Sequence, residues 1–171
     1  MSVGHRLRAA QIAAIVGAMT ALIGVIVRWF TVRWEGRIIE VPEFGTVPFP
    51  EETAAITGAD LGAGLPALAV LVGLAAVLAL LAGRRARPVA LAVSMLGALG
   101  LIVLALMAGA ADAIAAALPP PTAGVGEPTV VSAAGRIVTI VGAAIVAVGA
   151  GWGLPVASSV GEVRMPERAP D

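Results

Sequence analysis

Several residue types are missing from this chain of 171 residues. Cysteine, lysine, asparagine and tyrosine do not occur, and His5 is the only histidine. Without cysteine there is no disulfide, thiolate nucleophile or iron–sulfur site, and one histidine alone does not make a zinc site. We therefore expect no metal and no organic cofactor. Frequent Ala, Gly, Val and Arg without Lys or Asn is typical of a GC-rich genome, which indicates a bacterial source.

Charge is also scarce. Charged residues make up 13% of the chain and hydrophobic residues 59%, whereas an ordinary soluble domain has about 25% and about 45–50%. The apolar residues form four runs without any charged side chain, each close to the roughly 20 residues of a membrane-spanning helix. The runs cover residues 9–27, 61–82, 88–111 and 137–154. We therefore expect an all-α membrane protein, a bundle of four transmembrane helices whose single membrane domain covers residues 1–171.

The first run follows a basic start (His5, Arg6 and Arg8), which also occurs in cleaved signal peptides. The run is longer than the roughly 7–15 residues of a signal-peptide core, and the large residues of positions 28–30 follow it directly. We interpret it as a helix that is retained.

Arginine placement predicts the orientation. Arg84, Arg85 and Arg87 lie in one short connection, and short basic loops stay in the cytoplasm. These topology arginines place both termini in the cytoplasm, with outer loops at residues 28–60 and 112–136 and a cytoplasmic tail at 155–171. The expected location is the inner membrane of a bacterial cell, as a multi-pass protein. A formal net charge of zero gives no indication of nucleic-acid binding.

The first outer loop carries the strongest strand pattern. If Glu35 and Gly36 form a two-residue turn, β-branched and aromatic residues face each other across an extracytoplasmic β-hairpin. The expected pairs are Trp34 with Arg37, Val32 with Ile39, and Phe30 with Val41. The pattern favours an anchored cap over the bundle, and the alternative is a recognition surface. The candidate interaction surface comprises Trp29, Phe30, Trp34, Arg37 and Ile39.

The rest of the outer loops gives weaker signals. Residues 53–57 have the composition of a short third strand, and Asp60 suits the N-terminal cap of the second helix. Residues 118–132 are rich in proline and glycine, which predicts an irregular linker.

The predicted spans contain no ionisable residue, although such residues usually accompany catalysis or ion transport in a membrane. The clear polar side chains there are Gln11, Thr20, Ser94 and Thr139, and hydroxyl groups in spans commonly bond to their own helix backbone. Asp112 comes just after the third span, so we place it at the interface. We expect no enzyme and no catalytic residue.

Glycine spacing predicts how the helices pack. Gly135, Gly142 and Gly149 recur every seven residues, and Gly17 and Gly24 have the same spacing on the first helix. Small residues on one face allow two helix backbones to approach closely. We call these five residues the glycine seam; packing within one bundle explains it, and homo-oligomerisation is the alternative.

The order of features resembles a known family. A basic start, a first helix and a β-rich outer segment precede Ile56-Thr57-Gly58-Ala59-Asp60-Leu61, which leads into the second helix and an arginine-rich hairpin. This layout is similar to the actinobacterial tryptophan-biosynthesis-associated transmembrane family, and the local match is best over residues 56–104. The resemblance implies a four-helix membrane protein encoded beside tryptophan-synthesis genes, and it implies no activity.

Two functions are compatible with these features. The first is a non-enzymatic accessory or assembly subunit that acts through its helices and outer loop, with the lipid bilayer and another membrane protein, or a second copy, as partners. The alternative is a small oligomeric transporter or channel subunit for an aromatic metabolite, a substrate class that the family's gene neighbourhood implies.

Overall fold

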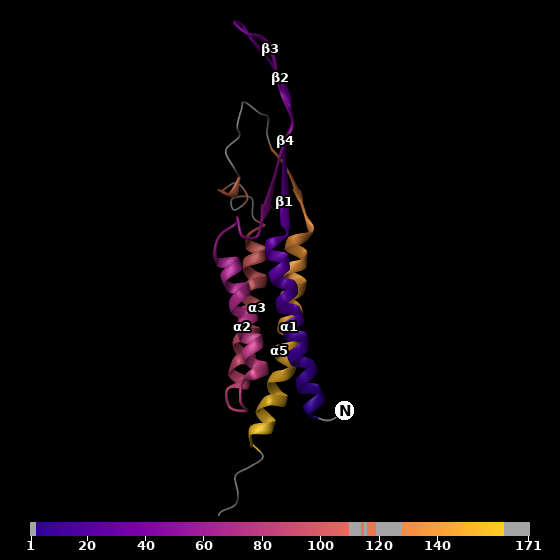
Figure 1. Cartoon of the computed structure of the whole chain (residues 1–171), viewed down its shortest axis with the longest axis vertical. Helices are drawn as coiled ribbons and strands as arrows, with labels where there is room; N and C mark the ends of the chain where they lie inside the picture. Colours follow the sequence, from indigo (N-terminus) through magenta and orange to yellow (C-terminus); the bar gives the residue numbers. More distant parts are fainter. Residues whose placement is uncertain (1–2, 110–113, 115, 119–127, 163–171) are drawn as a thin grey trace, which may run out of the picture.

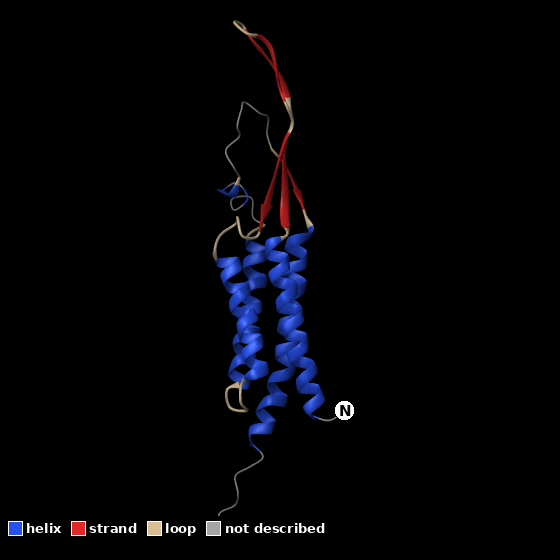
Figure 2. Cartoon of the chain, in the orientation of Figure 1, coloured by secondary structure: helices blue, strands red, loops and turns tan. Residues whose placement is uncertain are grey.

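The computed structural model describes residues 3–109, 114, 116–118 and 128–162. Four helices lie side by side, and a narrow group of strands extends from one end of them (Figures 1 and 2). The helices are α1 (Val3–Ile26), α2 (Gly64–Leu81), α3 (Arg87–Met107) and α5 (Ala134–Glu162). The strands are β1 (Arg28–Trp34), β2 (Arg37–Val41), β3 (Gly45–Phe49), β4 (Glu52–Thr57) and β5 (Thr129–Ser132).

All four helices are long and apolar enough to cross a membrane, and they coincide with the four predicted spans within a few residues. The predicted all-helical bundle is therefore confirmed at that level. The largest difference is at α5, which continues past the predicted end at Leu154 through Pro155 to Glu162. Pro155 lacks the N–H that would bond to Gly151 O, yet the helix continues, and in its last turns Ser158 Oγ donates to the carbonyl oxygens of Leu154 at 3.0 Å and of Pro155 at 3.1 Å.

The bundle is closed, because α1 packs on α5, α5 on α3, α3 on α2, and α2 on α1. Its interior is lined largely by alanine, whereas large apolar side chains point outward. Ala14, Ala76 and Ala98 are fully buried, while Met19 on α1 and Leu74 on α2 are exposed. Small interior residues let the helices approach closely, as in bundles that pack in lipid.

The strand pairing differs from the prediction. β1 pairs with β4 on one side and with β5 on the other in a three-stranded antiparallel sheet, and β2 pairs with β3. Trp34 faces Glu52 and Arg37 faces Phe49, so the β1–β4 and β2–β3 ladders keep one register and form a single long hairpin. The predicted two-residue turn at Glu35 and Gly36 is wrong.

The chain instead reverses over Pro42, Glu43 and Phe44, between Val41 and Gly45, which face each other. Proline presets the backbone angle for a turn, and Gly45 has a φ of 71°, in the left-handed region that glycine tolerates. Gly36 has no positive φ, as a type I′ or II′ turn would require in this position or its neighbour. The turn chemistry of residues 42–45 therefore decides the pairing.

Two further features of the outer loops were predicted in part. β4 covers the predicted third strand at 53–57. Strand β5 was missed, because the predicted irregular linker of residues 118–132 includes it. The triple proline of residues 119–121 and Asp112 lie outside the described residues.

Candidate interaction site

The buried polar side chains of the described bundle all have backbone partners. Ser94 Oγ donates to Ala90 O at 3.0 Å and Thr139 Oγ1 donates to Gly135 O at 2.9 Å, both within one helix. Gln11 is different, since its Nε2 donates across helices to Ala79 O at 2.7 Å. The side chains of Gln11, Ser94 and Thr139 therefore all donate to backbone carbonyls, two within their own helix and one across helices.

The Gln11 bond has a clear structural purpose. Ala79 lies in the last turn of α2, where carbonyl oxygens lack a helical N–H partner, and Gln11 supplies a donor. Arg87 acts likewise, because its Nη2 donates to Ala82 O at 3.0 Å, just beyond the helix. The predicted topology arginines thus differ in environment: Arg87 is half-buried against α2, whereas Arg84 and Arg85 are exposed.

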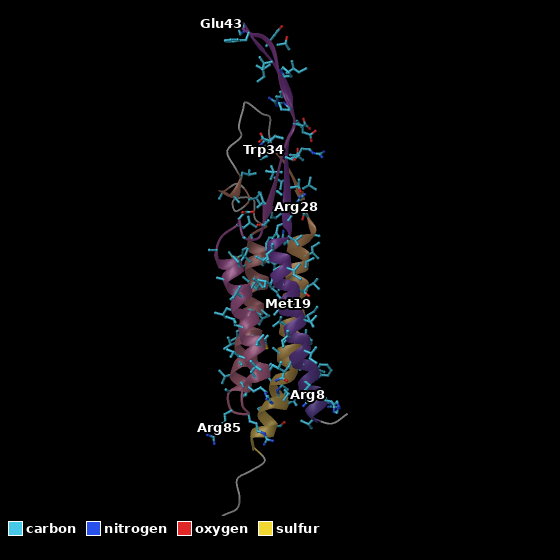
Figure 3. The ribbon with its side chains drawn as sticks, viewed as in Figure 1. Arg8, Met19, Arg28, Trp34, Glu43 and Arg85 are labelled. Carbon is cyan, nitrogen blue, oxygen red and sulfur yellow. The ribbon has the colours of Figure 1, made fainter. Side chains whose placement is uncertain are left out.

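Arg8 and Arg85 both lie at the bundle end opposite the strands (Figure 3). Six described acidic residues, from Glu35 to Asp60, lie at the other end, together with Arg28, Arg33, Arg37 and Arg136, whereas Glu162 ends α5 at the same end as Arg8 and Arg85. At the strand end the described acidic residues therefore outnumber the arginines, as the loop composition predicts.

Asp60 does not cap α2, which begins four residues later at Gly64. Its Oδ2 instead accepts hydrogen bonds from Thr57 N at 2.7 Å and Thr57 Oγ1 at 2.8 Å. These two donors stabilise the carboxylate and lower the pKa of Asp60 below its usual 3.8. Asp60 therefore closes the turn after β4, and Gly62, with a φ of 135°, separates it from the helix.

Across the described residues, no three His, Cys, Asp or Glu side chains are grouped closely enough to hold a metal ion. The described part of the chain therefore has no metal site built from three such side chains. The other notable features of this part are the helix-packing glycines, the junction at Trp29 and two exposed surfaces.

The five residues of the predicted glycine seam lie where α1 meets α5. A Cβ on Gly17 would be 2.7 Å from Gly142 O, and a Cβ on Gly149 would be 3.1 Å from Ala10 O. Gly24 and Thr139 are also in close contact. The seam is thus occupied within one chain and is not a free surface.

Trp29 joins the bundle to the sheet. Its side chain is 0% exposed, and Nε1 donates to Gly24 O at 2.8 Å. A Cβ on Gly58 would lie 2.8 Å from the indole Cε2, and one on Gly135 would lie 2.7 Å from Cδ1. The ring therefore fills the space between α1, α5 and the end of β4, which the sequence did not indicate.

The candidate interaction surface needs correction. Trp29, Phe30 and Trp34 are buried within the chain, Ile39 is half-buried, and only Arg37 is exposed. Phe30, Val32 and Trp34 alternate along β1 and belong to the core cluster, against which partly buried apolar side chains of Ile114, Ala117 and Leu118 also pack. The aromatic residues stabilise the sheet and do not form a docking patch.

The exposed part of the outer loop is farther out. We call residues 37–49, comprising β2, β3 and their turn, the arm; Glu43 marks its tip, well beyond the bundle (Figure 3). Ile38 is 75% exposed and Phe44 is 78% exposed. In the sequence, Phe44 lies in a proline-rich segment. Only its position between Pro42 and Gly45 could have predicted that it lies in a turn.

A second apolar feature is a half-open cleft of about 240 Å³ between α1 and α2. Ala18, Ala69 and Gly73 lie deep in it, and Met19 and Leu74 are at its exposed margins. A Cβ on Gly73 would meet nothing within 4 Å, unlike the seam glycines. This cleft faces outward from the bundle.

No family model matches the chain, and no curated protein and no solved structure matches it either. Function has to be argued from the arm, the bundle surface and the distribution of charge.

Proposed function

We propose that the chain is a multi-pass protein of a bacterial cell membrane that serves as a non-enzymatic accessory or assembly subunit. The single observation that carries the proposal is the arm, a two-stranded ribbon that extends beyond the bundle and has no packing partner among the described elements. An isolated two-stranded hairpin is only marginally stable in water. A projecting ribbon with exposed Ile38 and Phe44 is explained if another protein covers it.

Membrane insertion follows from the outer surface of the bundle. Large side chains such as Ile12, Leu78, Leu96 and Ile137, one from each helix, are more than half exposed on four helices that carry alanine inside. In water this would be an aggregation-prone surface, whereas in lipid it costs nothing. The positive-inside rule, applied to Arg84, Arg85 and Arg87, supports cytoplasmic termini and an arm outside the cell membrane.

The alternative, a transporter or channel subunit, gains no specific support. A substrate path needs polar groups along it, and the buried polar side chains described here are bonded to backbone carbonyls. The resemblance to the tryptophan-biosynthesis-associated family is compatible with the accessory role, because that family implies a membrane location without an activity.

Orientation is directly testable because the chain has no cysteine. We expect Thr46→Cys to react with a membrane-impermeant maleimide on intact cells, and Ser159→Cys to react only after permeabilisation. The reverse labelling pattern would refute the orientation. Labelling of both cysteines on intact cells would refute the proposal that the two positions lie on opposite sides of the membrane.

The subunit role is tested by purifying the tagged full-length protein from its native host in mild detergent and identifying companions by mass spectrometry. The matched control replaces residues 35–51 with Asn-Gly, which closes the β1–β4 ladder at the Trp34–Glu52 pair with a favoured two-residue turn. We expect a stoichiometric partner with the intact chain that is lost with the shortened one. Recovery of both only as monodisperse monomers would refute the proposal.

A further inference from the structure

The two edges of the arm are not equivalent. Ile38 faces Pro48, and because proline has no N–H, this must be a pair whose backbone groups point away from each other. The outer edge of β3 therefore lacks a donor at Pro48, and such an edge resists addition of another strand. The N–H groups of Ile38 and Glu40 point instead to the outer edge of β2, which no described strand occupies.

The β2 edge continues an edge that the chain already uses. Lower in the same hairpin, β5 pairs with β1 from Phe30 to Arg33. Since the two ladders of the hairpin share one register, β2 presents the continuation of that side. A strand added to β2 would lie in line with β5 and extend an existing three-stranded sheet.

Beyond Arg37 at its base, the charged residues of the arm are all acidic. Glu40 and Glu43 are exposed, and residues 38–50 contain no basic residue. Ile38 and Phe44 provide exposed apolar groups beside them. Charge complementarity therefore calls for a partner with basic side chains next to an apolar contact.

Neither the membrane nor a second copy fits this surface. At about 3.3 Å per residue, the fifteen steps from Arg28 to Glu43 carry the tip roughly 50 Å from the end of α1, beyond a headgroup layer of about 5–8 Å. Two copies inserted in the same membrane would present parallel β2 strands, so Glu40 would lie beside Glu40 in register. Like charges in neighbouring strands are destabilising.

We propose that an extended segment of a different protein outside the membrane, carrying lysine or arginine, adds as a strand to the β2 edge, with Phe44 as a neighbouring anchor. Recognition by strand addition takes affinity from backbone hydrogen bonds and specificity from alternate side chains. This inference rests on the proposed accessory function and names the chemistry of the partner.

The test places a photoreactive phenylalanine derivative at Phe44 of the full-length protein in its native cells, with a second position at Leu74 on the bundle surface. Ile38→Pro removes the outward N–H of β2 without removing a bond of the β2–β3 ladder. Thr46→Pro is the matched control, since Thr46 faces Glu40 and its N–H points to the opposite edge. Ile38→Thr controls for the lost apolar side chain.

We expect the Phe44 probe to cross-link a protein through a basic segment. Loss of one backbone bond and the added proline ring should reduce this adduct by at least about fivefold in Ile38→Pro, with Thr46→Pro and Ile38→Thr within about twofold of the unmodified arm. Equal losses in both proline variants, a lipid adduct, an adduct within the chain or one between two copies would overturn the inference. A protein adduct at Leu74 but not at Phe44 would overturn the strand-addition inference and leave the accessory function standing. The absence of a protein adduct at both positions would refute the inference and the accessory function.

Discussion

Replacing Gly17 with alanine should separate α1 from α5 and destabilise the bundle. The new Cβ would lie 2.7 Å from Gly142 O and 2.8 Å from Val146 N, two backbone atoms that cannot rotate away. An ordinary contact distance is roughly 0.7 Å longer, so the two helices have to move apart. A gap of about 0.5–1 Å elsewhere in their interface already loses a quarter to a half of each contact's dispersion energy. We expect a loss of about 1–3 kcal/mol in the free energy of unfolding, which is typical of overpacked interiors.

The control is Gly73→Ala, where the Cβ would meet nothing within 4 Å. Alanine is the better helix former by about 1 kcal/mol, so this variant should be neutral or slightly stabilised. Gly149→Ala, with its nearest atom at 3.1 Å, should fall between the two. Equilibrium unfolding in mixed micelles, followed by tryptophan fluorescence, measures all three. If Gly17→Ala and Gly73→Ala differ by less than about 0.5 kcal/mol, the resolution of such comparisons, the packing argument is refuted.

Three further predictions concern the outer segment. Trp29→Phe keeps an aromatic side chain but removes the donor to Gly24 O and part of the buried ring, so the free energy of unfolding should fall by at least about 1–3 kcal/mol, and an unchanged value would contradict a structural role of Trp29. Gly45→Ala forces alanine to a φ of 71° at a cost of about 1–2 kcal/mol, so amide exchange should quicken in the arm and not in the bundle; uniform change would contradict the argument. Because the pKa of Asp60 is lowered in the fold, its stabilisation of the turn is present above the unfolded value of 3.8 and is lost as pH falls through the lower folded value. The Thr57 amide resonance should titrate with a midpoint below 3.8, and the titration should vanish in Asp60→Asn.

The sequence was sufficient for the helices because their signal is a sum over about 20 residues. Four long runs without a charged residue are compatible with few structures other than membrane-spanning helices. Small errors in the predicted helix ends therefore do not change the predicted fold. The end of α5 was misplaced because the prediction ended with the apolar run at residue 154, whereas the helix continues through Pro155 to Glu162.

The strands were harder because their pairing depends on one turn. Glu35-Gly36 lies between two apolar segments and produces a plausible ladder, but Pro42 and Gly45 supply better turn geometry eight residues later. The position of the turn decides which residues face each other. With the turn that the structure shows, Ile38 and Phe44 are large exposed apolar residues of the hairpin. Strand β5 is four residues long and far away in the chain, so local pattern could not assign it to β1.

The burial of Trp29 affects function as well as stability. Tryptophan is typical of membrane interfaces, yet this ring is held by Gly24 of α1, Gly58 after β4 and Gly135 of α5. Three segments converge on this side chain: Gly24 accepts its hydrogen bond, and Gly58 and Gly135 lie so close to the indole that neither position has room for a Cβ. Since β1 follows α1 after a single residue and continues in register into the arm, this junction fixes the direction of the arm relative to the helices. A protein that binds the arm would therefore be oriented with respect to the whole bundle, which a flexible tether could not achieve and which an assembly subunit requires.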